Sequence, residues 1–110
     1  MAGALNTVIE TEIYLRSAER LMTEAERVSV VDFLAANPWA GDVIPGTGGL
    51  RKVRVPLAGR GKRGGARLIT CFVSGCGVYL LLAYAKGDQA NPTPAQAQAL
   101  ARLVDMLSRG

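Results

Sequence analysis

Histidine is absent from this chain of 110 residues. Histidine is the usual proton carrier near neutral pH and the commonest ligand of transition metals, so acid–base chemistry here is left to Lys, Arg, Tyr or a carboxylate. The chain has only two cysteines, Cys71 and Cys76, and their spacing fits no zinc motif. We therefore expect no metal site, no cofactor and a reduced cysteine pair, with Cys71 in a strand and Cys76 in a turn.

Long hydrophobic runs are also missing. The N-terminal sequence MAGALNTVIETE has no basic segment followed by an apolar one, and the apolar run around Leu80–Leu82 is far shorter than the ~20 residues that a membrane span needs. Hydrophobic residues nevertheless make up 49% of the chain, which is enough to form a core. We expect a cytoplasmic protein that does not bind membranes, with a single domain over residues 1–110.

Acidic residues are absent between Val43 and Gly87, where eight of the thirteen Lys and Arg residues lie. The two flanks hold the other five basic residues and all nine acidic ones, so the formal net charge of +4 hides a basic middle and acidic ends. A block of like charge repels itself unless a polyanion relieves it. The leading partner is therefore a nucleic-acid backbone.

Hydrophobic periodicity and capping signals predict seven elements. They are strand 7–10, helix 12–22, a helix from Thr23 to about 36, strands 50–57, 66–73 and 78–86, and a helix starting at Thr93-Pro94. Thr23 with Glu26, and Thr93 with Gln96, match capping boxes. This order predicts an α+β fold in which two N-terminal helices and a C-terminal helix cover one face of a small, twisted and mainly antiparallel sheet. The acidic faces of the first two helices are expected to point away from the basic side.

Alternation along the strands separates the basic side chains from the core. Val53, Val55 and Leu57 share one face of their strand, so Lys52 and Arg54 share the other. The same rule groups Arg67 with Ile69, Cys71 and Val73, and groups Val78, Leu80, Leu82, Tyr84 and Lys86. A curved sheet would bring Lys52, Arg54, Arg67, Tyr84 and Lys86 onto one concave, phosphate-binding surface.

The glycine-rich segments do not indicate a nucleotide site. Neither GTGGLRK nor GRGKRGG has the P-loop spacing, and a strand rather than a helix follows GTGGLRK. The segment with Arg60, Lys62 and Arg63 instead resembles Arg/Gly sequences that bind RNA through charge. The alternative is a hairpin loop kept soluble by its charge.

A cluster of cations can also catalyse RNA cleavage. RNA carries its own nucleophile, the 2′-OH, so cleavage needs a proton acceptor, a proton donor for the leaving 5′ oxygen and fixed positive charge at the transition state. Crowded cations lower the pKa of a lysine, which makes lysine a usable base without histidine or metal.

The run GDVIPGTGGLRKVRVPLAGRGKRGGARLI, followed by VYLLLAYAKGDQANPTPAQ, resembles the HigB branch of the RelE/ParE superfamily of toxins from type II toxin–antitoxin systems. The resemblance covers about residues 37–98 and implies a RelE-like fold. It also implies a ribosome-dependent mRNA endonuclease (mRNA interferase) that enters the ribosomal A site, inhibits translation and is neutralised by a helix-turn-helix antitoxin like HigA. Cleavage would proceed by metal-independent 2′-OH attack.

The resemblance also suggests roles for individual residues. Lys52 or Arg54 would orient the phosphate and assist proton transfer, with Lys52 the better base. Arg67 would stabilise the transition state, and Lys86 would be a phosphate ligand or acid. Further RNA contacts are expected from Arg51, Arg60, Lys62, Arg63 and Tyr84.

The chain departs from this branch at Thr70-Cys71, where relatives often have a Tyr pair, so Tyr84 and the more core-facing Tyr79 remain the candidates for base stacking. Two other functions stay open. ParE-like members of the superfamily share the fold and inhibit DNA gyrase, and a basic domain of this size also suits a non-catalytic RNA- or ribosome-binding module.

Overall fold

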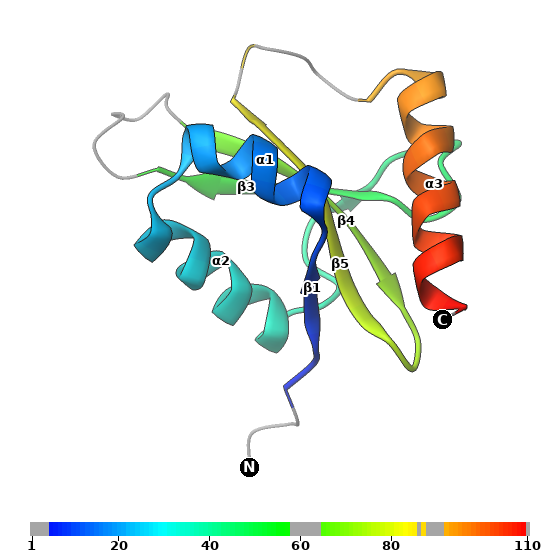
Figure 1. Ribbon diagram of the computed structural model, residues 1–110, viewed down its shortest axis with the longest axis horizontal. Helices are drawn as coiled ribbons and strands as arrows, with labels where there is room; N and C mark the ends of the chain where they lie inside the picture. Colours follow the sequence, from blue (N-terminus) through cyan, green and yellow to red (C-terminus); the bar gives the residue numbers. More distant parts are fainter. Residues whose placement is uncertain (1–4, 58–64, 86, 88–91, 110) are drawn as a thin grey trace.

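Three helices and five strands make up the computed structural model, which describes residues 5–57, 65–85, 87 and 92–109 (Figure 1). In chain order the elements are β1 (Val8–Glu10), α1 (Glu12–Leu21), α2 (Glu24–Ala36), β2 (Asp42–Val43), β3 (Arg51–Pro56), β4 (Gly65–Val73), β5 (Gly77–Ala85) and α3 (Pro94–Ser108). The predicted α+β class is confirmed, and the predicted elements are all present. The short strand β2 was not predicted.

The strands form one mixed sheet in the order β1-β5-β4-β3-β2. The pairs β5–β4, β4–β3 and β3–β2 are antiparallel, whereas β1 runs parallel to β5. The Cα radius of gyration is 13.4 Å, close to the ~13 Å expected for a compact domain of this length. None of the helices in the described ranges is long and apolar enough to cross a membrane.

The helices cover both faces of the sheet rather than one face as predicted. Helices α1 and α2 pack on one side, where Tyr14, Ala18 and Leu34 meet side chains of β3, β4 and β5. Helix α3 packs on the opposite side through Leu100 and Val104, and Figure 1 shows the sheet between the two groups. The prediction failed because β5 is buried on both faces, and such a strand carries no alternation that reveals a second covering layer.

Helix α1 is tied to β5 by polar contacts as well as by burial. The hydroxyl of Thr11, its N-cap residue, accepts from Tyr14 N (3.2 Å) and donates to Leu80 O (2.7 Å). Ser17 lies one helical turn after Tyr14, and its Oγ accepts from the backbone N–H of Ala83 on β5 (2.9 Å). Ala83 lies on the part of β5 that extends past the end of β1. The bond with Ser17 thus supplies a partner to a backbone N–H on the part of β5 that β1 does not reach.

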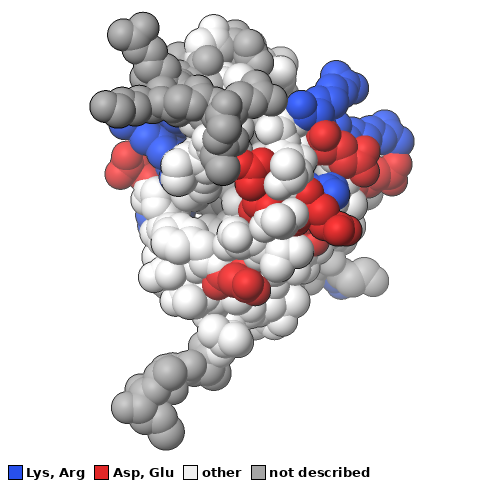
Figure 2. Space-filling view, turned by 90° about the vertical axis from the view of Figure 1, so that its left-hand side faces the viewer, with Lys and Arg blue, Asp and Glu red and all other residues white. Residues whose placement is uncertain are grey.

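Both predicted capping boxes are present, at Thr23 with Glu26 and at Thr93 with Gln96. Within α2 the buried positions are Val30 and Leu34, whereas Val28 is 54% exposed. The acidic residues Glu12, Glu19, Glu24 and Asp32 are exposed on these helices, as expected. Figure 2 views this side and shows carboxylates and basic side chains lying next to one another, with largely uncharged surface around them.

A β-bulge between Ile69 and Thr70 corrects the predicted faces of β5. Ile69 pairs with Leu82, but Thr70 pairs with Leu80, so the two strands differ by one residue there. Val78 and Leu80 therefore face α1 and α2, whereas Tyr84 faces the other way. The prediction that Val78, Leu80, Leu82 and Tyr84 share a face was wrong because a bulge reverses the alternation beyond it.

Candidate nucleic-acid interface

A row of basic side chains crosses the middle of the sheet on the face opposite to α1 and α2. Arg54 on β3 pairs with Arg67 on β4, which in turn pairs with Tyr84 on β5. Lys52 lies two residues before Arg54 and so projects from the same face, opposite Ile69. We call the surface formed by Lys52, Arg54 and Arg67 the cationic face. The strands thus bring together three of the four predicted catalytic residues.

No carboxylate in the described ranges forms an ion pair with either arginine of the cationic face. Ion pairs in the described ranges join Arg16 to Glu12, Arg27 to Glu19 and Arg109 to Asp105. Directly opposite side chains on antiparallel strands have Cβ atoms about 4.5–5.5 Å apart, and like charges at this separation destabilise the sheet. Arg54 is exposed and Arg67 half-buried, so both guanidinium groups remain able to meet an anion from solvent. The pair has the charge and spacing to bind a phosphate.

Tyr84 closes the row on the third strand, but only 7% of it is exposed. Burial raises the pKa of its hydroxyl, and the positive charge of Arg67 acts in the opposite direction. The phenol therefore stays protonated at neutral pH and can donate a hydrogen bond. Its ring is too covered to stack broadly on a base, and Tyr79, at 4% exposed, is buried as predicted.

Glycine at position 65 leaves room beside Arg67. A Cβ added there would lie 3.5 Å from Arg67 Nη1 and 3.1 Å from the carbonyl oxygen of Val55. Gly65 pairs with Pro56 at the start of β4, two residues from Arg67 and therefore on the same face. The tight contact is the one with the Val55 carbonyl oxygen, so a side chain at position 65 would press on β3, whereas its contact with Arg67 would be an ordinary one.

Asp42 is a neighbour of the cationic face that the sequence did not reveal. It lies on β2 directly opposite Lys52, and it is exposed. The sequence places Asp42 only ten residues before Lys52, within a Gly/Pro-rich segment that has no strand periodicity. A two-residue strand is too short to show alternation, and this short antiparallel pairing is what brings the carboxylate to the lysine.

Arg51 lies on the opposite face of the sheet from Lys52, Arg54 and Arg67. Its guanidinium donates to the carbonyl oxygens of Trp39 (3.2 Å) and Gly41 (3.0 Å). The group also lies 5.2 Å from the centre of the Trp39 ring, which contacts Phe72. Arg51 thus holds the segment between α2 and β2 against the sheet and is not part of the cationic face.

Four predicted residues lie outside the described ranges. They are Lys86, proposed for catalysis, and the predicted RNA ligands Arg60, Lys62 and Arg63. Strand β5 ends at Ala85, one residue before Lys86.

The two cysteines are unpaired and half-buried, Cys71 in β4 and Cys76 in the turn before β5, as predicted. Burial raises the pKa of the Cys71 thiol, which keeps it protonated. In the described ranges, no three His, Cys, Asp or Glu side chains come together as a metal-binding group. No protein-family model matches this chain.

Proposed function

We propose that this chain is a HigB-like toxin of the RelE/ParE superfamily that cleaves mRNA on the ribosome and thereby inhibits translation. The observation that carries the proposal is the Arg54–Arg67 cross-strand pair, which has no carboxylate partner among the described residues and lies on the same face as Lys52. A repulsive pair of this kind favours a surface that meets polyanions.

The proposed reaction needs only groups that a cationic surface can supply. The 2′ oxygen of a nucleotide attacks the adjacent phosphorus, and the bond to the 5′ oxygen breaks. The products are a 2′,3′-cyclic phosphate and a 5′-OH. Charge builds up on the phosphoryl oxygens in the transition state, where fixed guanidinium groups stabilise it without reorganisation.

We assign separate roles to the members of the cationic face. Guanidinium groups remain protonated in proteins, so Arg54 and Arg67 hold the phosphate and stabilise the transition state. Lys52 is the proton acceptor from the 2′-OH. Lys86, which lies outside the described ranges, is assigned to protonating the leaving oxygen or binding the phosphate.

The partners follow from this function. The toxin would act in the cytoplasm at the ribosomal A site, with Arg60, Lys62 and Arg63 contacting ribosomal RNA. A helix-turn-helix antitoxin would neutralise it.

The decisive experiment is to induce the protein briefly in a bacterial host and map the 5′ ends of cellular RNA. We expect growth arrest, loss of translation and new 5′-OH ends within coding regions. Purified protein should cut mRNA only when ribosomes are present.

Two outcomes would select other functions. DNA damage with intact mRNA would indicate a gyrase-directed toxin. Salt-sensitive RNA binding without new product ends would indicate a non-catalytic module, since phosphate contacts alone give affinity that falls steeply with salt.

A further inference from the structure

A hollow opens where β1, α1 and α2 meet, on the side of the sheet away from the cationic face. Its volume is about 330 Å³, at the lower end of the ~300–1,000 Å³ range of small-molecule sites. The last residue of β1, one residue near the start of α1 and one stripe of α2 supply its walls. The lining residues are Glu10, Leu15, Glu24, Arg27, Val28 and Val31. We call this space the β1–α2 hollow.

Two buried polar atoms beside this hollow have no hydrogen-bond partner among the described residues. They are the hydroxyl of Tyr14, a residue that is 0% exposed, and Nε of Arg27. The charges of Glu10 and Arg27 act on the Tyr14 hydroxyl, and both residues line the hollow, so the hydroxyl lies next to it. Burial and the charge of Glu10 raise the pKa of Tyr14, against the effect of Arg27, which keeps the hydroxyl protonated. Both atoms are therefore donors that an acceptor in the hollow would satisfy.

The two carboxylates of the hollow lie nearer to solvent. Glu10 and Glu24 are exposed, and neither belongs to an ion pair in the described ranges. Arg27 Nη1 lies 4.0 Å from a carboxylate oxygen of Glu19, which is not part of the lining, so the charge of Arg27 is directed partly away from the hollow. The hollow thus presents negative charge toward solvent and hydrogen-bond donors deeper inside. A cationic group suits the first, and an acceptor suits the second.

The remaining lining residues are apolar. Leu15 and Val31 are half-buried, and Val28 is 54% exposed. The two valines belong to the same stripe of α2 as Glu24 and Arg27, because residues three and four apart lie on one face of a helix. An aliphatic group placed against them would remove apolar surface from water.

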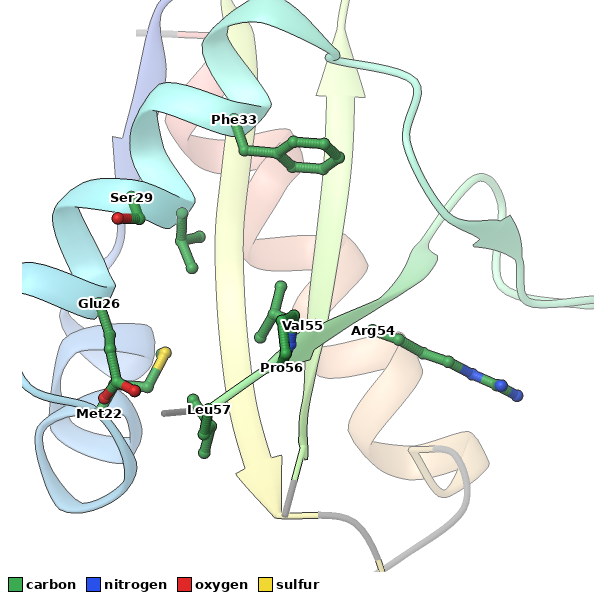
Figure 3. Close-up of a pocket in the computed structure, with 9 residues that line it drawn as sticks. Met22, Glu26, Ser29, Phe33, Arg54, Val55, Pro56 and Leu57 are labelled. Atoms are coloured by element: carbon green, nitrogen blue, oxygen red, sulfur yellow. The ribbon is translucent and has the colours of Figure 1, made fainter. Parts of the chain in front are cut away.

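The other hollow beside α2 has a different chemistry. It lies between α2 and β3, has a volume of about 530 Å³ and is lined mainly by apolar side chains. Figure 3 shows Phe33 and Leu57 on its two sides, with Arg54 extending away from α2. Its carboxylate, Glu26, accepts from the backbone N–H of Thr23 in the capping box. None of the buried atoms that lack a partner in the described ranges belongs to a residue lining it, so this groove offers apolar contact only.

We propose that the β1–α2 hollow binds a free α-amino acid with a branched aliphatic side chain. Its carboxylate accepts hydrogen bonds from the Tyr14 hydroxyl and Arg27 Nε, and its ammonium group lies beside Glu10 and Glu24. Its side chain packs on the apolar wall. A simple amine would leave two buried donors unsatisfied, and a simple carboxylic acid would meet the charge of the two glutamates uncompensated. A zwitterion suits both ends of the hollow.

Binding would join β1, α1 and α2 through one ligand and so stabilise the folded chain. The proposal does not depend on the proposed nuclease activity, because the hollow and the cationic face lie on opposite sides of the sheet.

The test uses the full chain, L-leucine and two analogues that each lack one charged group. Isocaproate lacks the ammonium group, and isoamylamine lacks the carboxylate. We expect NMR signals of the lining residues to shift saturably, with leucine binding at least about tenfold more tightly than either analogue, since each analogue loses hydrogen bonds that involve a charged group. Leucine should also raise the urea midpoint, because a ligand that binds only the folded chain stabilises it.

Two conservative variants assign the two ends of the ligand. Tyr14→Phe removes only the buried hydroxyl, so it should weaken leucine binding by about three- to tenfold and leave isoamylamine binding unchanged. Glu10→Gln removes one carboxylate charge, so it should weaken the binding of leucine and isoamylamine but not that of isocaproate. A merely structural role of either residue would affect all three ligands alike.

Matched variants of α2 locate the site. Val28→Lys places an amine four residues after Glu24, where it fills the hollow and competes for the carboxylates, and it should weaken leucine binding by at least about tenfold. Phe33→Ala is the control, because Phe33 is similarly exposed (46%) on the same helix but lines the other groove. It should bind leucine normally. The NMR spectrum of each variant checks its folding.

Equal affinity for leucine and its two analogues would overturn the proposal, because apolar contact alone would then explain binding. Weaker binding to Phe33→Ala with unchanged binding to Val28→Lys would overturn it by placing the ligand in the other groove. Absence of saturable binding by every aliphatic amino acid would also overturn it. None of these results bears on mRNA cleavage, which is measured separately with ribosomes, so failure of this site and failure of the proposed function are distinguishable.

Discussion

The two faces of β3, a strand of six residues, differ in the side chains that they carry: one face is mainly apolar and buried, and the other carries Lys52 and Arg54. On the side of α1 and α2, Val53 is 3% exposed and lies in a continuous apolar cluster with Leu68 of β4. On the other side, Lys52 and Arg54 meet Ile69 and Arg67. One face is selected to exclude water and contributes to stability. The other places like charges together at a cost in stability, which indicates selection for binding.

The cost of this arrangement distinguishes it from an ordinary solvated surface. A basic residue that only aids solubility can face a carboxylate or a small polar residue on the next strand, and either choice is more stable than a like charge. Arg54 faces another arginine instead. Substitutions on the cationic face should therefore change mainly activity, and substitutions on the apolar face should change mainly stability.

Removing Arg67 should produce the largest change in activity. We expect Arg67→Ala to reduce ribosome-dependent cleavage by about 10²–10³-fold, the usual loss when one fixed transition-state contact is deleted. The free energy of unfolding should stay the same or rise by a few tenths of a kcal/mol, because a like-charge pair is relieved. Single-turnover cleavage of a defined mRNA and urea unfolding measure the two effects.

Arg20→Ala is the matched control, because Arg20 is an exposed arginine on α1, on the other side of the sheet. It should cleave normally. Equal activity in Arg20→Ala and Arg67→Ala would refute the assignment of the cationic face.

Tyrosines on the two faces should respond differently to alkaline pH. Burial raises the pKa of Tyr14 to about 12, with a further increase from Glu10 and a decrease from Arg27. The unfolded chain releases this proton near pH 10, so the stability from Tyr14 is complete below about pH 10 and is lost by about pH 12. A difference of about two pKa units corresponds to about 3 kcal/mol. Tyr14→Phe should flatten the fall in unfolding free energy over this range by that amount.

Tyr84→Phe provides the comparison from the cationic face. Burial also raises the pKa of Tyr84, but the charge of Arg67 opposes the increase. This variant should therefore flatten the alkaline decline less than Tyr14→Phe does. Unfolding by urea at intervals from pH 8 to 11.5 gives the slopes, and a larger relief in Tyr84→Phe would contradict the electrostatic difference between the faces.

Local chemistry made much of the fold predictable. Thr23 and Thr93 start their helices through short-range hydrogen bonds, so the capping boxes were visible in four consecutive residues. Alternation on β3 separated Lys52 and Arg54 from Val53 correctly, because one face of that strand is apolar and the other charged.

Long-range features were not predictable in the same way. The bulge at Ile69–Thr70 depends on how two strands align, and neither strand alone records it. The proximity of Asp42 to Lys52 depends on a strand of only two residues. The place of α3 on the second face depends on β5, which is apolar throughout and so does not indicate which helix covers which side.

The Asp42 carboxylate should have a moderate effect on the cationic face. We expect Asp42→Asn to lower cleavage by about tenfold, because it removes the carboxylate that lies on the strand directly opposite Lys52, the residue assigned to proton transfer. Asp42→Glu should restore most activity. Asp32→Asn on α2, an exposed carboxylate far from β2, is the control. Unchanged cleavage in Asp42→Asn would mean that this carboxylate has no part in the chemistry of the cationic face.

The smallest expected effect is a change in stability on substitution of Thr70, which lies at the β-bulge between β4 and β5. Thr70 is 1% exposed, and its hydroxyl oxygen has no hydrogen-bond partner among the described residues. A buried polar group without a partner costs about 1–3 kcal/mol, part of which Thr70→Val should recover at nearly constant volume. We expect the urea midpoint to rise by an amount equivalent to about 0.5–1 kcal/mol. Cleavage should be unchanged, because Thr70 pairs with Arg51 and Leu80, away from Arg67.

Thr47→Val is the contrasting variant, since the Thr47 hydroxyl donates to Ile44 O (2.5 Å) and accepts from Leu50 N (3.2 Å). It should lose stability, so a gain in both variants would show that added β-propensity, rather than relief of an unpaired hydroxyl, stabilises the protein.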